Sequence, residues 1–170
     1  MRISIAGPGK FEWYEKINSN CKEIILEIAN ILAKSGNEIV LTPDKDSALA
    51  FLGKEYLKNG GKKIYEIVPL DDKQWGYKKY LDTTLGEIIN CGTWENQAAE
   101  FNKQSEIMIC LAYGGMVMAE IACTRYYNPK KVYIIKELIT AKLPSELNET
   151  FDIEYISYKD LKKIFNSYKK

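Results

Sequence analysis

The sequence predicts an α/β protein: a single Rossmann-like domain over residues 1–170, with a doubly wound, mostly parallel sheet and helices on both faces. Three observations support this fold class. Short β-prone runs alternate with amphipathic helical stretches along the whole chain. A chain of 170 residues that is 46% hydrophobic can bury one core. No repeat, low-complexity tract or linker divides it, so we expect one sheet of about five to seven strands.

The elements can be placed by their boundaries as well as by their periodicity. Gly7-Pro8-Gly9 and Thr42-Pro43-Asp44 end β-prone runs, and Gly36 is well placed to end a helix. In the last helix, Ser157 and Asp160 have the spacing of a capping box. The predicted strands are 2–6, 38–41, 63–68, 87–91, 107–112, 131–135 and 153–156, and the predicted helices begin near residues 20, 45, 94, 115 and 158.

Two segments differ from this regular alternation. Residues 107–112 (IMICLA) form the most apolar strand, and strands covered on both faces lose their alternation, so we place this strand at the centre beside residues 2–6. Residues 69–86 have no clean period and combine polar with aromatic side chains. A loop of this length in a compact domain is typically functional or mobile.

The composition excludes several classes of site. The chain has no histidine, which excludes Ser-His-Asp triads and histidine-liganded metals. Arg2 and Arg125 are its two arginines, so bidentate clamps on phosphate must be few. The cysteines, which are Cys21, Cys91, Cys110 and Cys123, form no CxxC pair. We therefore expect reduced, mostly buried thiols and no metal site.

Charge and hydropathy indicate the expected compartment of the protein and the classes of partner that it lacks. The formal net charge of +1 gives no electrostatic argument for nucleic-acid binding. No apolar run approaches the roughly 20 residues that a membrane helix needs, and no signal peptide is evident after Met1. We expect a cytoplasmic protein that binds neither nucleic acid nor membrane.

Ligands of doubly wound sheets bind beyond the carboxyl ends of the strands. Glycines there allow close backbone approach to a phosphate, although they can equally be tight strand-to-helix turns. Asp44 has two equally weighted roles, capping the second helix or touching a ligand. The candidate ligand-binding residues at these ends are Gly7, Pro8, Gly9, Thr42, Asp44, Tyr113, Gly114, Gly115 and Met116.

Glu120 is the candidate catalytic residue. It follows Gly114-Gly115 by one to two helical turns in an otherwise apolar stretch, MVMAEIAC, and could point back to the cleft as an acid or base. The alternative is a helix residue that pairs with a lysine or with Arg125.

The aromatic residues near these strand ends have two possible roles. Tyr113, Trp75, Tyr77 and Tyr80 could stack on a base or simply pack, whereas Trp94, at helical spacing, is expected in the core.

The motifs IAGPGK, TWENQAAEFNKQSEIMICLAYGGMVMAEIA and KVYII resemble the lysine-decarboxylase-like family, which includes cytokinin-activating nucleotide phosphoribohydrolases and a molybdenum-cofactor carrier protein. The resemblance covers most of the chain and implies a nucleotide-binding Rossmann-like fold that is commonly dimeric. It also implies that Gly114 and Gly115 hold a phosphate. In this family the glutamate at the position of Glu120 cleaves an N-glycosidic bond.

The chain departs from the family's PGGxGTxxE motif. In an alignment without gaps on Glu120, Gly114 meets the second motif glycine, and Met116 and Val117 replace a glycine and the threonine, whereas one gap would pair Gly114-Gly115 with the motif's two glycines. The family's arginine falls near Asn96 and Gln97, which makes Asn96 a further candidate ligand residue. A weaker resemblance is to nucleoside 2-deoxyribosyltransferases, which share an opening like IAGP and a glutamate at this position.

Three functions therefore stay open. The first is a protein that binds a nucleotide or nucleoside derivative, needs no cofactor and has slow or absent catalysis. The second is an enzyme, hydrolase or transferase, that cleaves N-glycosidic bonds through Glu120. The third is a non-catalytic carrier or interaction domain. In each case we expect a homodimer.

Overall fold

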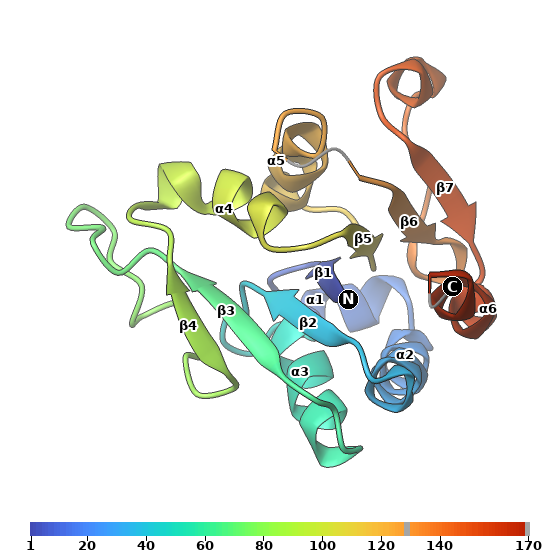
Figure 1. Cartoon of the computed structure of the whole chain (residues 1–170), viewed down its shortest axis with the longest axis horizontal. Coiled ribbons are helices and arrows are strands. Elements are labelled where there is room, and N and C mark those ends of the chain that lie inside the picture. The colour runs from blue at the N-terminus through green and yellow to red at the C-terminus, as the bar shows by residue number, and fades with distance from the viewer. Residues whose placement is uncertain (128–129, 169–170) are drawn as a thin grey trace.

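A computed structural model of the chain describes residues 1–127 and 130–168. It contains one parallel sheet with the strand order β4-β3-β2-β1-β5-β6-β7, which confirms the predicted fold class (Figure 1). The strands are β1 (Arg2–Ala6), β2 (Glu38–Leu41), β3 (Ile64–Val68), β4 (Glu87–Asn90), β5 (Ile107–Cys110), β6 (Val132–Ile135) and β7 (Ile153–Ile156).

The centre of the sheet is the pair β1 and β5, as predicted from the apolar IMICLA run. Ile3 lies opposite Ile107 and Ile5 opposite Ile109. From β1 the chain continues to β2 on one side of β1 and reaches β5 later on the other side. The strand order thus reverses at β1, which makes its carboxyl end the topological switch point of the fold.

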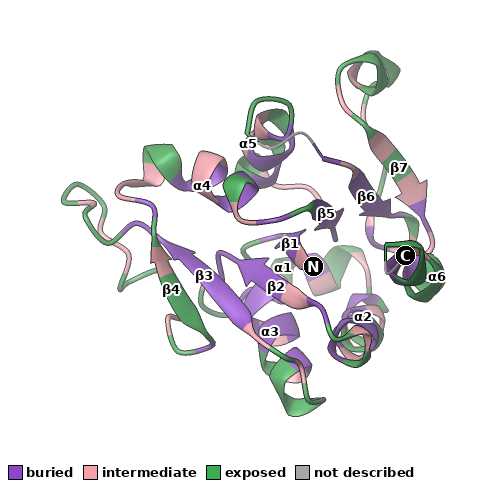
Figure 2. Cartoon of the chain, viewed as in Figure 1, coloured by how far each residue is buried: buried purple, intermediate pink, exposed green. Residues whose placement is uncertain are grey.

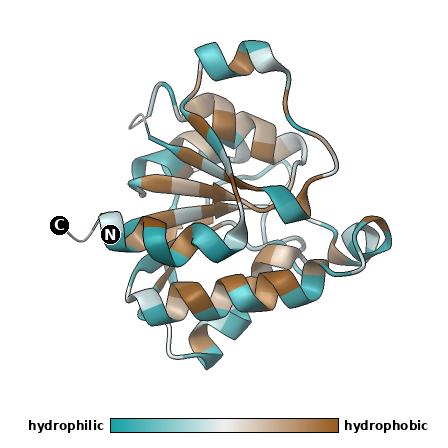
Figure 3. Cartoon of the chain, turned by 90° about the vertical axis from the view of Figure 1, so that its right-hand side faces the viewer, coloured by the Kyte–Doolittle hydropathy of each residue, from teal (hydrophilic) through white to brown (hydrophobic). Residues whose placement is uncertain are grey.

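Helices cover both faces of the sheet (Figure 1). α2 packs against α3, α6 and α1 on one face, and α4 packs against α5 on the other. The helices are α1 (Phe11–Ile17), α2 (Cys21–Ser35), α3 (Ala48–Lys58), α4 (Gln97–Lys103), α5 (Gly115–Cys123) and α6 (Leu161–Ser167). In Figure 3 the apolar strands run between helices whose colours alternate between hydrophobic and hydrophilic, as expected for amphipathic helices that cover a sheet.

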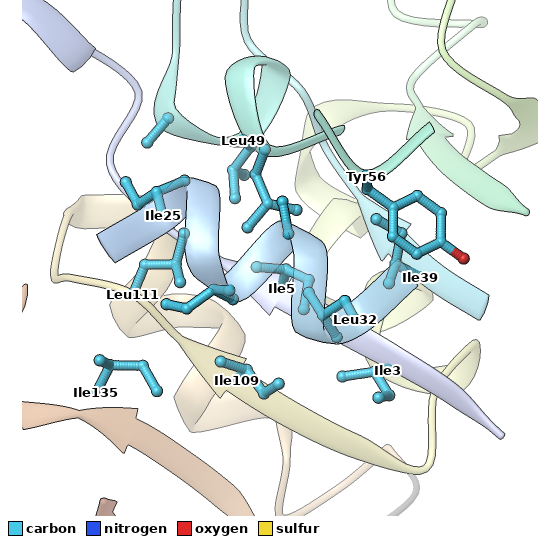
Figure 4. Close-up of a cluster of buried hydrophobic side chains, with 14 of the residues drawn as sticks. Ile3, Ile5, Ile25, Leu32, Ile39, Leu49, Tyr56, Ile109, Leu111 and Ile135 are labelled. Carbon is cyan, nitrogen blue, oxygen red and sulfur yellow. The ribbon is translucent and has the colours of Figure 1, made fainter. Parts of the chain in front are cut away.

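The larger core lies between α2 and the central strands. Ile25 and Leu32 of α2 are fully buried over Ile3, Ile5 and Ile109, as Figure 4 shows. Each side chain of this size stabilises the fold by roughly 1.5–3 kcal/mol when fully buried. α2 ends as predicted, because Gly36 adopts the left-handed conformation with φ 72°.

Burial decreases from the centre of the sheet to one of its edges. β5 and β6 are buried at every residue, whereas β4 is exposed over most of its length (Figure 2). Cys21, Cys91 and Cys110 are buried free thiols and Cys123 is a partly buried one, in agreement with the prediction. No helix within the described part of the chain is both long and apolar enough to span a membrane.

The local predictions have mixed outcomes. α1 was not predicted, because FEWYEKI has no clear helical stripe and its N-cap position, Lys10, makes no side-chain cap. Ser47, not Asp44, caps α3, and its side chain accepts from the Ala50 N–H at 3.0 Å. The capping box of Ser157 and Asp160 is confirmed. The expected homodimer stays a prediction.

Candidate functional site

A cavity of about 610 Å³ opens beyond the carboxyl ends of β1 and β2, beside the first turn of α5. This is the switch point of the sheet, where ligands of such folds bind. The volume falls within the range of roughly 300–1,000 Å³ that is typical of small-molecule sites. The lining residues are Gly9, Lys10, Asp44, Lys45, Trp75, Lys79, Tyr80, Trp94 and Met116.

Three aromatic rings line the cavity. Trp94 donates from Nε1 to the carbonyl oxygen of Gly76 at 2.8 Å. Its ring meets the Tyr80 ring edge to face, with the centroids 6.4 Å apart and the planes at 80°. Trp75 is 63% exposed. Partly exposed aromatic faces of this kind can stack on the planar ring of a ligand.

The prediction that Trp94 belongs to the core is wrong. The residue is only half-buried and lies at the cavity, because it starts a short 3₁₀-helix (Trp94–Asn96) before α4. The buried aromatic residue of this segment is Phe101, on α4.

Defined hydrogen bonds hold the loop that carries Trp75 and Tyr80. The Asp72 carboxylate accepts from the backbone N–H groups of Trp75 at 2.7 Å and Trp94 at 3.3 Å, and these bonds keep the pKa of Asp72 below its ordinary value. The Lys45 N–H donates to the carbonyl oxygen of Tyr80 at 2.7 Å. The long loop predicted to be functional or mobile thus forms a wall of the cavity.

The charged side chains of the cavity lining are three lysines and one carboxylate. Lys45 donates from Nζ to the carbonyl oxygen of Lys78 at 2.7 Å, and Lys10 and Lys79 also line the cavity. Burial raises the pKa of Asp44 to about 6, so this group is still mostly ionised at neutral pH. The lysines outnumber the carboxylate, so the cavity favours an anionic ligand.

The turn after β1 does not form an open phosphate cradle. A Cβ atom at Gly9 would lie 2.7 Å from Oδ2 of Asp44, so the absence of a side chain allows the carboxylate to approach this turn. A Cβ atom at Gly7 would lie 3.2 Å from Leu49, and Pro8 is buried. A negative charge against the turn disfavours a phosphate there, so the geometry favours the alternative of a tight strand-to-helix connection.

Glu120 lies in a buried polar cluster rather than in the cavity wall. Gln97 of α4 donates from Nε2 to Thr42 Oγ1 at 2.6 Å and to Glu120 Oε1 at 2.9 Å. Asn102 donates from Nδ2 to the Glu120 carbonyl oxygen at 2.8 Å and so joins α4 to α5. Glu120 is 4% exposed, and within the described part of the chain it is not among the residues that line the cavity.

Burial raises the pKa of Glu120 to about 8. The hydrogen bond from Gln97 opposes this rise, whereas the negative charge of Asp44 adds to it. The carboxyl group is therefore mostly protonated at neutral pH. Its hydrogen-bond partner is Gln97, so the alternative pairing with a lysine or with Arg125 is not observed among the described residues.

The structure brings together only some of the predicted site residues. Gly9, Asp44 and Met116 line the cavity, and Thr42 is joined to Glu120 through Gln97. Elsewhere, Asn96 is exposed, Gly114 and Gly115 begin α5 outside the cavity wall, Tyr113 packs against the core, and Tyr77 is half-buried away from the lining.

Sequence reasoning missed the three lysines and Gln97. Lys10 directly follows the first glycine turn, and Lys79 belongs to the run YKKY, in which two lysines stand between two tyrosines. This combination of basic and aromatic side chains was the signal that could have identified the loop as a wall for an anionic, planar ligand.

No protein-family profile matches the sequence, and no curated protein matches it. Solved structures do match. The molybdenum cofactor binding protein of the phototrophic bacterium Rippkaea orientalis is similar with a TM-score of 0.74 and 16% identity, over 99% of this chain and 97% of that one. The molybdenum cofactor carrier protein of Chlamydomonas reinhardtii has a TM-score of 0.71 and 14% identity, over 98% and 96%.

A third solved structure, that of TM1055, has a TM-score of 0.72 and 14% identity, over 98% of each chain. Identities this low establish the fold alone. The resemblance drawn from the sequence motifs is therefore confirmed at the level of the fold: the chain has the Rossmann-like architecture of molybdenum cofactor carrier proteins.

Proposed function

We propose that the protein binds and carries a small, phosphorylated heteroaromatic molecule, such as a nucleotide or a pterin phosphate, without cleaving it. The observation that carries this proposal is the combination of Trp75, Tyr80 and Trp94 with three lysines around one cavity at the switch point of the sheet. Stacking on an aromatic face contributes about 1–3 kcal/mol per ring, and lysines supply the charge for a phosphate.

The environment of Glu120 favours a carrier over an enzyme. The carboxyl group is buried behind Gln97 and its raised pKa keeps it mostly neutral, so it supplies little negative charge to an oxocarbenium-like transition state. The two arginines lie elsewhere in the fold: Arg2 pairs with Glu38 at the amino end of β1, and Arg125 lies over Tyr126 after α5.

The structural neighbours support the same choice, because two of them are described as a binding protein and a carrier protein for the molybdenum cofactor. Binding of a small molecule by these neighbours is consistent with a cavity of this size that has an aromatic and basic lining.

N-glycosidic cleavage through Glu120 is the second candidate. A carboxyl group with a pKa of about 8 is protonated at neutral pH and has the right state for a general acid. Glu120→Gln would then abolish base release from nucleoside monophosphates while ligand binding persists. If the native protein releases no base from nucleoside monophosphates, the cleavage function is excluded and the carrier function is favoured.

Tryptophan fluorescence tests the binding proposal directly. The chain has three tryptophans, of which Trp75 and Trp94 line the cavity and Trp13 lies on α1 outside it. We expect nucleoside monophosphates or a pterin phosphate to quench the native protein and the Trp13→Phe variant alike. The double variant Trp75→Phe/Trp94→Phe should respond weakly. Absence of saturable binding of every such phosphate by the native protein would overturn the proposal.

A further inference from the structure

The Asp44 carboxylate is the one negatively charged side chain of the cavity lining, and it has no partner there. Among the residues that the structure describes, none places a donor or a cation within bonding distance of its oxygens, although three lysines line the same cavity. Burial alone accounts for its raised pKa. A half-buried carboxylate with free acceptor capacity calls for donors from another molecule.

The backbone places this carboxylate beside the aromatic wall. Asp44 forms an antiparallel bridge with Leu81, and the next residue, Lys45, donates its N–H to the carbonyl oxygen of Tyr80 at 2.7 Å. Tyr80 in turn meets Trp94 edge to face. A planar ring stacked in this wall would therefore have its edge near Asp44, while its anionic group could reach the lysines.

On the other side, the carboxylate lies against the turn after β1. The absence of a side chain at Gly9 leaves room for Oδ2 of Asp44. Any bulkier residue at position 9 would displace the carboxylate from this place. The acceptor is thus held between the aromatic wall and a backbone turn, which fixes where a ligand must present its donors.

We propose that Asp44 selects the ring of the ligand by accepting two neighbouring N–H groups, the pattern that a ring N–H and the adjacent 2-amino group present in guanine and in pterins. This inference rests on the proposed function of the cavity. Along its pairing edge adenine presents the 6-amino donor next to the N1 acceptor. One oxygen of the Asp44 carboxylate would therefore face the N1 lone pair instead of an N–H group. Hypoxanthine keeps one of the two donors and loses the 2-amino group.

A carboxylate just after the second strand can also bind ribose hydroxyls, as in dinucleotide-binding folds. The position of Asp44 beside the aromatic wall favours contact with the ring edge instead. The two roles are separable, because only binding to ribose would depend on the 2′-hydroxyl.

The test is the affinity of the native protein for GMP, IMP, AMP, 2′-deoxy-GMP and 6-hydroxymethylpterin phosphate, measured by isothermal titration calorimetry at pH 7.5. We expect GMP to bind roughly tenfold or more tightly than AMP, in line with a good bidentate contact, with IMP between them. The affinity for 2′-deoxy-GMP should equal that for GMP. In Asp44→Asn the preference for GMP should vanish, because an amide fits adenine at least as well.

Asp46→Asn is the matched control. It removes the same charge two residues away, from an exposed side chain outside the cavity lining, and asparagine tolerates the backbone φ of 57° at this position. This variant should keep the native preference for GMP.

Each other outcome has a definite meaning. Equal affinities for GMP and AMP in the native protein would overturn the role of Asp44 and leave the proposed function standing. A preference for GMP that survives in Asp44→Asn would also overturn it. Loss of affinity with 2′-deoxy-GMP would assign Asp44 to the ribose. Failure of every nucleotide and of 6-hydroxymethylpterin phosphate to bind would overturn the proposed function itself.

Discussion

The carboxyl group of Asp44 faces an open cavity, whereas that of Glu120 is buried between α4 and α5. Burial raises the pKa of both groups, to about 6 for Asp44 and about 8 for Glu120. The difference lies in their neighbours: Glu120 accepts a hydrogen bond from Gln97, and Asp44 lacks a partner among the described residues. One group is therefore available to a ligand, and the other links two helices.

This comparison teaches that a carboxyl group in the right place along the sequence need not have access to the site. Glu120 lies on the helix after the central strand, where an acid or base would be expected, but its oxygen is engaged by Gln97. Asp44 was an ambiguous candidate in the sequence, and its access to the cavity makes it the stronger one for ligand contact.

The largest expected effect is a pH dependence of stability caused by Glu120. The ordinary pKa of a glutamate is 4.5 and burial raises that of Glu120 to about 8, so the folded state binds more protons between these values. The free energy of unfolding should therefore fall as the pH rises from about 5 to 9, by an amount on the order of 3 kcal/mol. Urea unfolding followed at several pH values measures this fall.

Glu120→Gln separates this contribution from those of other groups. The amide oxygen can still accept from Gln97, and the variant should lose most of the fall near pH 8. Glu66 is fully buried on β3, and burial raises its pKa to about 7, so part of the fall should persist and disappear in Glu66→Gln. An unchanged pH profile in Glu120→Gln would contradict the assignment of the high pKa to Glu120.

The second effect concerns Gln97, whose side-chain amide joins Thr42 and Glu120 in the buried polar cluster. In Gln97→Leu, Thr42 Oγ1 and Glu120 Oε1 both lose the Nε2 donor. Leaving buried polar atoms without partners costs about 1–3 kcal/mol, which thermal or urea unfolding can measure. The pKa of Glu120 should also rise further, because this hydrogen bond opposes the effect of burial.

Asn96→Leu is the control for this variant. Asn96 precedes Gln97, is exposed, and bonds only weakly to Thr93 Oγ1, at 3.5 Å. Its replacement should change stability by no more than about 0.5 kcal/mol. Equal losses in the two variants would mean that the cluster contributes nothing specific.

The third effect concerns the aromatic wall of the cavity. Trp94→Ala removes a ring from the cavity wall together with the hydrogen bond to Gly76, and we expect ligand affinity to fall about tenfold. Trp94→Phe keeps a ring and should lose less. Calorimetric titration with GMP measures both, and unchanged affinity in Trp94→Ala would exclude stacking on Trp94.

Most of the fold could be predicted from the sequence, because the signals for it are local. Each of the seven strands is a β-prone run between turn residues. In IMICLA, apolar and polar residues do not alternate, which indicates a central strand that is covered on both faces. Gly36 and Ser157 set helix boundaries through backbone geometry and capping alone. α1 was missed because it depends on tertiary contacts such as that between Tyr14 and the carbonyl oxygen of Leu138.

The site was less predictable, because access depends on contacts between distant segments. Gln97 meets Thr42 across 55 positions of the chain, and neither residue signals this partner in the sequence. Trp94 has the spacing of a core residue, yet a short 3₁₀-helix turns it toward the loop at Gly76. The basic lining was missed because lysines are usually solvated, and only the folded loop shows which of them surround the cavity.

The smallest expected effect is that of one lysine of the cavity. Lys45 is exposed, so its attraction to a phosphate is weakened by water and salt, and Lys45→Gln should lower the affinity for GMP only about threefold at low ionic strength. The difference between native protein and variant should shrink further at high salt, since screening removes the contribution of the charge. Lys34→Gln, at an exposed position on α2 outside the cavity lining, provides the control and should bind GMP like the native protein. Equal losses in the two variants would show that overall charge, rather than the position of Lys45 at the cavity, attracts the ligand.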